Sequence, residues 1–469
     1  MKRNGVALCL ATLAATALPA AARAQGFGLN EIGSCAIGRA FAVTGAPCDD
    51  GSAIYWNPGA ATAQSDRVHV LLGAAAVDVS GQFRADFTGR VDKGHVPTEV
   101  PPHLFVNWKP TPRLAAGVGV YIPYGLTSEW NSDFPGRFSA QHASIASVYV
   151  QPNAAYEIVP GRLSIGAGPV IAHSSVKLRQ GVDLSQQKLP NGATFAAIGV
   201  LPGTQFAEAK LTGDAMAYGY NVGVSARLLP TLQVGARYLS RIDFDFDDAD
   251  AVFYQTPTGL TFAGAVPNPA GGAPALPPGT IVDTLVAPQF RPGGALSRQK
   301  ASTSIPHPAQ FQVGVGFSGF PGTTLSLDAV WVGWSAFKTL PVNFSNATTP
   351  DRNLIEDYDD VWGVRAGAEH RFGIGVVGRA GFAFAATPAP DVTVTPLLPD
   401  MDRYNYTLGL GVPLGGHFSL DASYLSVQTE GRRGRLVERT SESQTAAQLN
   451  SGFYALNANI FSLSLKATY

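Results

Sequence analysis

The chain ends in the stretch FSLSLKATY, Phe461 to Tyr469, in which apolar and polar side chains alternate strictly. Successive side chains of a β-strand point to opposite faces, so this stretch predicts a strand with one apolar and one polar face. The same alternation recurs upstream in residues 218–227, 325–331, 404–412 and 418–424. The sequence therefore predicts an all-β protein of many amphipathic strands.

Alternation alone also fits a soluble sandwich, so the connections between strands decide the class. Six short turns rich in Gly and Pro lie at residues 109–112, 159–161, 229–231, 319–322, 372–375 and 413–416. Long polar or Gly/Pro-rich segments lie between them, the longest from about residue 247 to 300. Short turns at one end and long loops at the other are typical of an outer-membrane barrel, here of about 14 antiparallel strands.

The properties of a lipid bilayer explain why this pattern indicates a closed barrel. A hydrocarbon core offers the backbone no hydrogen-bonding partner, so only helices and closed barrels can cross it. After the N-terminal segment the sequence has no run of apolar residues long enough for a spanning helix. Aromatic residues near the expected strand ends would form the interfacial girdles: Trp108, Trp331, Trp334, Trp362 and Tyr469.

The amino-acid composition is consistent with a single large domain and excludes some functions. Of 469 residues, 45% are hydrophobic and 14% charged, against roughly 25% charged in an ordinary soluble domain. The formal net charge of −1 provides no basic field for nucleic acid. No metal-binding or nucleophilic motif stands out, so we expect no catalytic residue, no metal and no cofactor, and no enzyme activity.

The N-terminus has the features of an export signal. Lys2 and Arg3 precede an apolar stretch, residues 6–18, and Ala22-Arg23-Ala24 has the shape that a signal peptidase accepts. Residues 1–24 are therefore expected to be removed. Cys35 and Cys48 remain, and an oxidising periplasm would permit a disulfide between them, two buried thiols being the alternative.

Residues 25–65 precede the first strand, which is expected to start near Arg67. They mix small and apolar residues with Gly and do not alternate. Such a segment cannot face lipid and is too apolar to hang free, so we expect it to plug the lumen of a barrel formed by residues 66–469.

At this segment the sequence resembles a known family. The stretches are Gly26-Phe27-Gly28-Leu29-Asn30-Glu31, Gly38-Arg39-Ala40, Asp49-Asp50 and Asn57-Pro58-Gly59. They are similar to the hatch of the outer-membrane long-chain fatty-acid transporters, the FadL family, which includes aromatic-hydrocarbon transporters. The family's usual Asn-Pro-Ala reads Asn-Pro-Gly here. Residues 121–126 resemble the third strand, where that family kinks the wall, and residues 334–338 and 389–403 resemble later strands and a loop.

The resemblance implies a fourteen-stranded barrel with an N-terminal hatch, located in the outer membrane. Family members capture a hydrophobic ligand on outer loops, hold it in an internal pocket and release it sideways into the membrane. Long-chain fatty acids are the first expectation for the substrate; an aromatic hydrocarbon, or a general diffusion porin instead of a transporter, are the alternatives. Outer-membrane lipid, lipopolysaccharide and the barrel-insertion machinery are the other expected partners.

Three groups of residues are predicted to carry this function. Pro123, Tyr124 and Gly125 mark a lateral opening, because Pro lacks a ladder donor and Gly marks bulges; a harmless irregularity is the alternative. Phe195, Phe253 and Phe262 lie on expected outer loops. They indicate a capture groove, unless the loops pack on one another.

Cations for a ligand carboxylate form the third group. Extending the parity of Ser326 and Asp328 turns Lys338 inward, and the family has a basic position there. Lys177 and Arg179 are second candidates. For each of the three, a solvated loop charge is the alternative.

Other charged residues have less specific roles. Arg432, Arg433, Arg435 and Arg439 could meet lipopolysaccharide phosphates, or form a plain solvated loop. The acidic tracts at residues 243–250 and 356–360 could bind Ca²⁺, but inward carboxylates on a strand and a solvated loop explain them without a metal.

Overall fold

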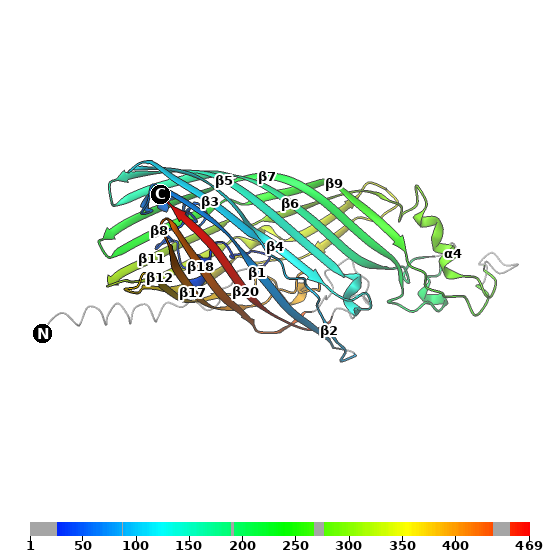
Figure 1. Ribbon diagram of the computed structural model, residues 1–469. Helices are drawn as coiled ribbons and strands as arrows, with labels where there is room; N and C mark the ends of the chain where they lie inside the picture. Colours follow the sequence, from blue (N-terminus) through cyan, green and yellow to red (C-terminus); the bar gives the residue numbers. More distant parts are fainter. Residues whose placement is uncertain (1–25, 87, 189–191, 267–275, 435–450) are drawn as a thin grey trace.

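The structure is a computed structural model that describes residues 26–86, 88–188, 192–266, 276–434 and 451–469 (Figure 1). The predicted signal segment 1–24 and two of the loop arginines, Arg435 and Arg439, lie outside the described residues. The strands are β1 (Val68–Ala85), β2 (Val91–Lys93), β3 (Pro102–Thr111), β4 (Leu114–Glu129), β5 (His142–Val159), β6 (Leu163–Asp183), β7 (Gln205–Leu229), β8 (Leu232–Leu239), β9 (Ile242–Gln255), β10 (Gln299–His307), β11 (Gln310–Phe320), β12 (Thr323–Val332), β13 (Thr339–Phe344), β14 (Arg352–Ile355), β15 (Val361–Arg371), β16 (Val377–Ala385), β17 (Arg403–Gly415), β18 (Phe418–Thr429), β19 (Arg432–Gly434) and β20 (Gly452–Thr468).

These strands close into one antiparallel barrel, as the sequence predicted. Short breaks divide four of the wall strands into consecutive pieces: β8 with β9, β10 with β11, β12 with β13, and β14 with β15. The short strands β2 and β19 are counted with β3 and β18, because they pair with the same neighbours, β1 and β20. The wall therefore has 14 strands, and β1 closes the ring by pairing with β20 along its length. Each wall strand pairs with its neighbours in the chain, which keeps the connections short at one end.

Helices are few and short. They are α2 (Ser34–Gly38), α3 (Ala53–Trp56), η1 (Pro58–Ala63), η2 (Pro135–Phe138), η3 (Ala196–Ile198), α4 (Val282–Val286), η4 (Ala287–Phe290), η5 (Trp334–Ala336) and η6 (Asp391–Thr393). Over the described part of the chain, no helix combines the length and apolarity needed to cross a bilayer.

The alternation of side chains gives the barrel two different surfaces. On β20, Phe461 and Leu463 are 61% and 57% exposed, whereas Ser462 and Ser464 are buried in the interior. The apolar face therefore meets lipid and the polar face meets the lumen. Among the predicted girdle residues Trp108, Trp362 and Tyr469 are exposed, but Trp334 is fully buried inside the barrel, so its assignment was wrong.

The acidic tract on β9 also faces the other way from our expectation. Asp243, Asp245 and Asp247 are exposed on the outside of the wall, while Phe244 and Phe246 are buried toward the lumen. The break between β8 and β9 at residues 240–241 shifts the alternation by one residue. A one-residue shift turns every following side chain to the opposite face.

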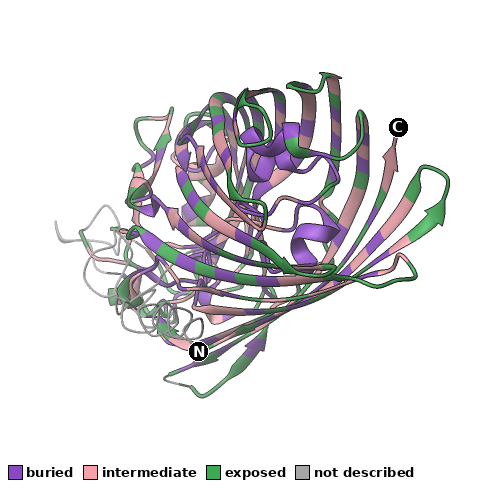
Figure 2. Cartoon of the chain, turned by 90° about the vertical axis from the view of Figure 1, so that its left-hand side faces the viewer, coloured by how far each residue is buried: buried purple, intermediate pink, exposed green. Residues whose placement is uncertain are grey.

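Residues 26–64 contact the lumen-facing side of the wall, and Figure 2 shows their short helices, coloured as buried, within the ring of strands. The Ser34 hydroxyl lies 2.8 Å from the hydroxyls of Ser462 and Ser464 on β20. Across the lumen, Thr44 donates its backbone N–H to Asp328 on β12 at 2.8 Å. The Asn57 amide donates to the Val224 carbonyl on β7 at 3.0 Å.

At three glycines of the inner segment, its backbone packs directly against the backbone of the wall. A Cβ on Gly45 would lie 2.4 Å from the backbone of Gly314 on β11, and one on Gly59 would lie 2.6 Å from the Gly223 oxygen on β7. A Cβ on Gly38 would lie 3.0 Å from the Gly409 Cα on β17. At these three points the inner segment and the wall therefore leave no room for a side chain between them.

The two remaining cysteines are joined. Cys35 at the start of α2 and Cys48 form a disulfide, and both are buried. The bond closes a loop of 13 residues within the inner segment.

Candidate functional site

The start of the inner segment pairs with the wall at the predicted kink. Leu29 donates its N–H to the Pro123 carbonyl at 2.8 Å, and Gly125 donates to the Phe27 carbonyl at 3.0 Å. At this point the pairing of β4 with β5 shifts register between Tyr121 and Tyr124. Because Pro123 has no N–H to give to a ladder, β4 leaves the regular wall here and pairs inward instead.

The neighbouring strand β3 does not extend far enough to pair with β4 at this kink. Its pairing with β4 reaches only from Thr111 to Leu104, opposite Val120, so the extracellular half of β4 has no β3 partner. Residues 94–101, which we call the strap, cross this part of the wall. The strap bonds to β1 through Glu99 and Val77, and to β4 through the His95 N–H and the Glu129 carbonyl at 2.8 Å.

A cavity of about 350 Å³ lies between the inner segment, the strap and the kink. Lumen-facing side chains such as Val77, Val427 and Ile460 line it, together with Leu29 of the inner segment. Ser144 and Ala146, which alternate with lumen-facing neighbours on β5 and face outward, line it as well. The cavity therefore reaches from the lumen to the outer surface of the wall.

The charged groups of the cavity are mostly acidic. Four carboxylates line it, those of Glu31, Glu99, Glu129 and Asp400. Arg403 is the one cationic side chain among the described residues that line it. Its guanidinium donates to Asp400 at 2.7 Å and to the Gly26 carbonyl at 2.9 Å. Burial raises the pKa of the Glu31 carboxyl above its usual value, against the opposing effects of backbone hydrogen bonds and of Arg403.

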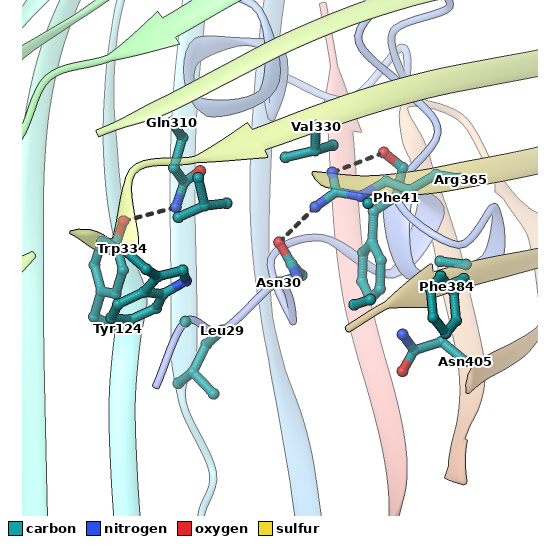
Figure 3. Close-up of a pocket in the computed structure, with 15 residues that line it drawn as sticks. Leu29, Asn30, Phe41, Tyr124, Gln310, Val330, Trp334, Arg365, Phe384 and Asn405 are labelled. Carbon is teal, nitrogen blue, oxygen red and sulfur yellow. Dashed lines mark hydrogen bonds between the residues drawn. The ribbon is translucent and has the colours of Figure 1, made fainter. Parts of the chain in front are cut away.

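A much smaller cavity of about 30 Å³ lies on the other side of the inner segment (Figure 3). Arg365 from β15 donates there to Asn30 at 3.0 Å, and Gln310 donates to the Tyr124 hydroxyl at 2.8 Å. This volume suits a water molecule or two and no substrate. The contact of Arg365 instead holds Asn30 against the wall, and that of Gln310 joins β11 to β4.

Lys338 does not line either cavity. Its side chain is 46% exposed, and its ammonium donates to the Tyr358 carbonyl at 2.7 Å and lies 3.4 Å from Asp357. The parity argument that turned Lys338 inward was wrong, because η5 interrupts the strand after β12. Phe337 takes the buried position instead.

The two second candidates lie near the cavity's outer side but do not line it. Lys177 on β6 is exposed and pairs with outward-facing Ser144. The Arg179 guanidinium lies 3.5 Å from the Glu129 carboxylate. Neither cation therefore points into the cavity.

Two of the predicted capture residues pack within the outer loops, and the third, Phe253, lies on strand β9 instead. Phe195 and Phe262 are buried in one apolar cluster with Phe206 and Val282. Phe253 contacts Phe344, with ring centroids 5.9 Å apart. Loop packing, the alternative left open by the sequence, accounts for these contacts.

Ionic contacts hold other loop residues. Burial would raise the pKa of Asp283, but hydrogen bonds from Thr258 and Gly259 lower it below its usual value. Arg432 pairs with Asp391, and Arg433 lies 2.8 Å from Asp86. These two arginines are therefore engaged within the protein.

Sequence reasoning missed the strap and the residues that cover the cavity from the loops, Trp130 and Leu398 to Met401. The strap did carry a signal. Pro97 and Pro101 argue against a regular strand over residues 94–101.

Comparison with known proteins assigns the family. The model of the family described as outer membrane protein transport protein (OMPP1/FadL/TodX) matches residues 14–469. The chain belongs to this family. As the family name states, its members are outer-membrane transport proteins, and the resemblance noted in the sequence is confirmed.

Individual relatives are distant. The chain is 24% identical to a long-chain fatty acid transport protein of Escherichia coli O6:H1, over 89% of this chain and 92% of that protein. It is 24% identical to a 47 kDa outer membrane protein of Pasteurella multocida, over 96% and 97%.

Two solved structures share the fold. A Pseudomonas aeruginosa FadL homologue has a TM-score of 0.77 at 19% identity, covering 95% of this chain and all of that one, 100%. The Pseudomonas putida toluene transporter TodX has a TM-score of 0.67 at 15% identity, covering 95% and 100%.

Proposed function

We propose that this outer-membrane transporter takes up uncharged hydrophobic compounds and releases them sideways into the membrane through the cavity between the strap and the β4 kink. The cavity carries the proposal, because lumen-facing and outward-facing side chains line the same space. An apolar ligand gains about 25 cal/mol for each Å² that leaves water, which favours a route from the cavity into lipid.

The inner segment supports the same route. We propose that residues 26–64 act as a hatch that blocks the axis of the barrel, the role expected of residues 25–65. Trp56 and Tyr55, two of the largest fully buried side chains, belong to this segment. A ligand in the cavity would meet this packed segment toward the periplasm and the gap beside β3 toward the lipid.

The charges of the cavity favour an uncharged substrate over a fatty acid. A buried carboxylate needs a cation or several donors. The acidic side chains that line the cavity outnumber its one arginine, and that arginine is already bonded to Asp400. An aromatic hydrocarbon carries no charge and therefore needs no cation in its binding site. This is the class of compound in the name of the toluene transporter.

The lateral route is tested by blocking the cavity where it reaches the outer surface of the wall. Ala146→Trp places a large side chain on the outward side of the cavity, and we expect it to lower the uptake of radiolabelled toluene at least tenfold. Ala366→Trp is the matched control, because Ala366 also faces outward but lies on β15 away from the cavity. Equal uptake by both variants would exclude a route past Ala146.

Long-chain fatty acids are the second candidate, supported by Arg403 and by the name of the Escherichia coli relative. Binding of oleate and toluene to the purified protein separates the two. We expect Arg403→Gln to leave toluene binding within about twofold. A strong loss of oleate binding in this variant, with oleate bound more tightly than toluene by the unmodified protein, would favour the fatty acid.

Lys338→Ala provides a further prediction. We expect it to leave the uptake of both compounds unchanged, because its ammonium is bonded to Tyr358 outside the cavity. A loss of oleate uptake measured in cells would instead place Lys338 in the pathway.

A further inference from the structure

An open groove of about 590 Å³ lies on the outer face of the wall, on the side away from the lumen. It crosses six neighbouring wall strands, β4 to β8 and β11. Ala154, Ala167 and Ala236 form its floor, and Ala154 pairs directly with Ala167.

Large side chains border this floor on two sides. Tyr156 pairs with Ile165 on one side, and these residues are 45% and 48% exposed. Tyr238 pairs with Phe311 on the other side. The groove is therefore a recess between two apolar ridges rather than a flat part of the lipid-facing surface.

The recess has a structural cause on the opposite face of the wall. A Cβ on Gly166 would lie 2.3 Å from the Pro58 oxygen, and one on Gly223 would lie 2.3 Å from the Asn57 side-chain oxygen. The inner segment thus presses directly on the wall backbone here. The wall has glycine on its inner side here, and on its outer side it has alanine on β5, β6 and β8, with Val222 and Val224 of β7 between them.

One end of the groove, at β4 and β5, lies near the end of the barrel that carries the short turns, which faces the periplasm. Leu114, which lines it, is the first residue of β4, and Tyr156 lies three residues before the end of β5. Strands rise about 3.3 Å per residue, so these positions are within the periplasmic leaflet and close to its headgroups. That leaflet of an outer membrane consists of phospholipid.

A cation marks this end of the groove. The Arg113 guanidinium lies 5.0 Å from the centre of the Tyr156 ring. Its Nε and Nη2 groups donate to the carbonyls of Glu157 and Ile158. Among the described residues, its Nη1 group has no hydrogen-bond partner. The nearby Glu157 carboxylate accepts from the Gly161 N–H at 2.7 Å.

We propose that the groove binds one phospholipid of the periplasmic leaflet, with an acyl chain on the alanine floor and the phosphate at Arg113. The apolar ridges suit the chain, and the free Nη1 group suits a phosphate oxygen, since guanidinium groups bind phosphate strongly. The opposite leaflet cannot supply this lipid, because its headgroups lie at the far end of the strands. The site is separate from the transport cavity.

Native mass spectrometry of the full-length protein in detergent tests the proposal, with palmitoyl-oleoyl-phosphatidylglycerol as the added lipid. We expect one lipid to stay bound. Ala167→Phe fills the floor and is expected to lower the bound fraction at least tenfold, whereas Ala366→Phe, on an outward-facing position of β15, leaves it unchanged. Arg113→Gln is expected to lower it about threefold or more.

Several results would overturn the proposal. Equal retention by Ala167→Phe and Ala366→Phe would exclude the groove, and so would no retention by the unmodified protein. If glycerophosphate without acyl chains displaced the lipid, the headgroup alone would account for binding. Ala154→Leu provides a milder floor variant should Ala167→Phe fail to give the heat-resistant gel mobility of a folded barrel, and its unchanged retention would likewise exclude the site.

Discussion

Deletion of residues 26–64 is expected to raise the ion conductance of the barrel in a planar bilayer by at least about tenfold, because a barrel of this size otherwise encloses an aqueous channel. The deleted residues contact β20, β12 and β7, on different sides of the lumen. The unmodified protein measured in the same bilayer is the reference. Unchanged conductance in the folded deletion variant would mean that other residues close the lumen.

A single substitution tests the contact between the inner segment and the wall with a smaller change than the deletion. A Cβ on Gly235 would lie 2.1 Å from the Thr44 oxygen, so Gly235→Val must push the inner segment away from β8. We expect a measurable leak that is smaller than that of the deletion. Gly373→Val is the matched control, because a Cβ there would have no atom within 4 Å. Equal conductance in the two variants would contradict the tight contact.

The second large effect is expected from tying the start of the inner segment to the kinked strand. A Cβ on Gly125 would lie 3.7 Å from the Leu29 Cγ, the atom whose place a cysteine sulfur would take, so oxidation is expected to join cysteines placed at both positions. If residues 26–31 must leave β4 to let ligand pass, the oxidised Leu29→Cys/Gly125→Cys protein should take up toluene at least tenfold more slowly.

The two single cysteine variants and the reduced double variant serve as controls for this experiment. The reductant must be mild enough to leave the buried disulfide between Cys35 and Cys48 intact, which is checked by counting free thiols. We expect their uptake to remain close to that of the unmodified protein. Rapid uptake by the oxidised double variant would show that ligand passes without separation of Leu29 from the kink.

Local patterns were sufficient to predict the wall of the barrel. The stretch from Phe461 to Tyr469 is a strand with a lipid-facing and a lumen-facing side, because a period of two translates directly into two faces. The short turns and the start of β1 beside Arg67 also follow from local sequence. The ring closes because every strand must find a second partner in a membrane.

The site was harder to predict, since its parts lie far apart in the chain and depend on interruptions of the strands. The alternation of inward and outward side chains that includes Asp328 does not continue to Lys338, because η5 interrupts the strand. The alternation on β8 does not continue into β9 either, because the strand breaks before Ile242. Neither break has a sequence signal as clear as the prolines of the strap. Arg403 and Gly26 meet only in the folded barrel, 377 residues apart.

The contacts of Gly38, Gly45 and Gly59 with glycines of the wall divide the circumference into two unequal parts. At these three positions the wall and the inner segment fit so closely that neither can gain a methyl group without the other retreating. Changes in the size or shape of the transported compound are therefore excluded there over evolutionary time and must arise elsewhere in the lumen. Divergent members of the family should keep these glycines and vary the side chains that line the cavity.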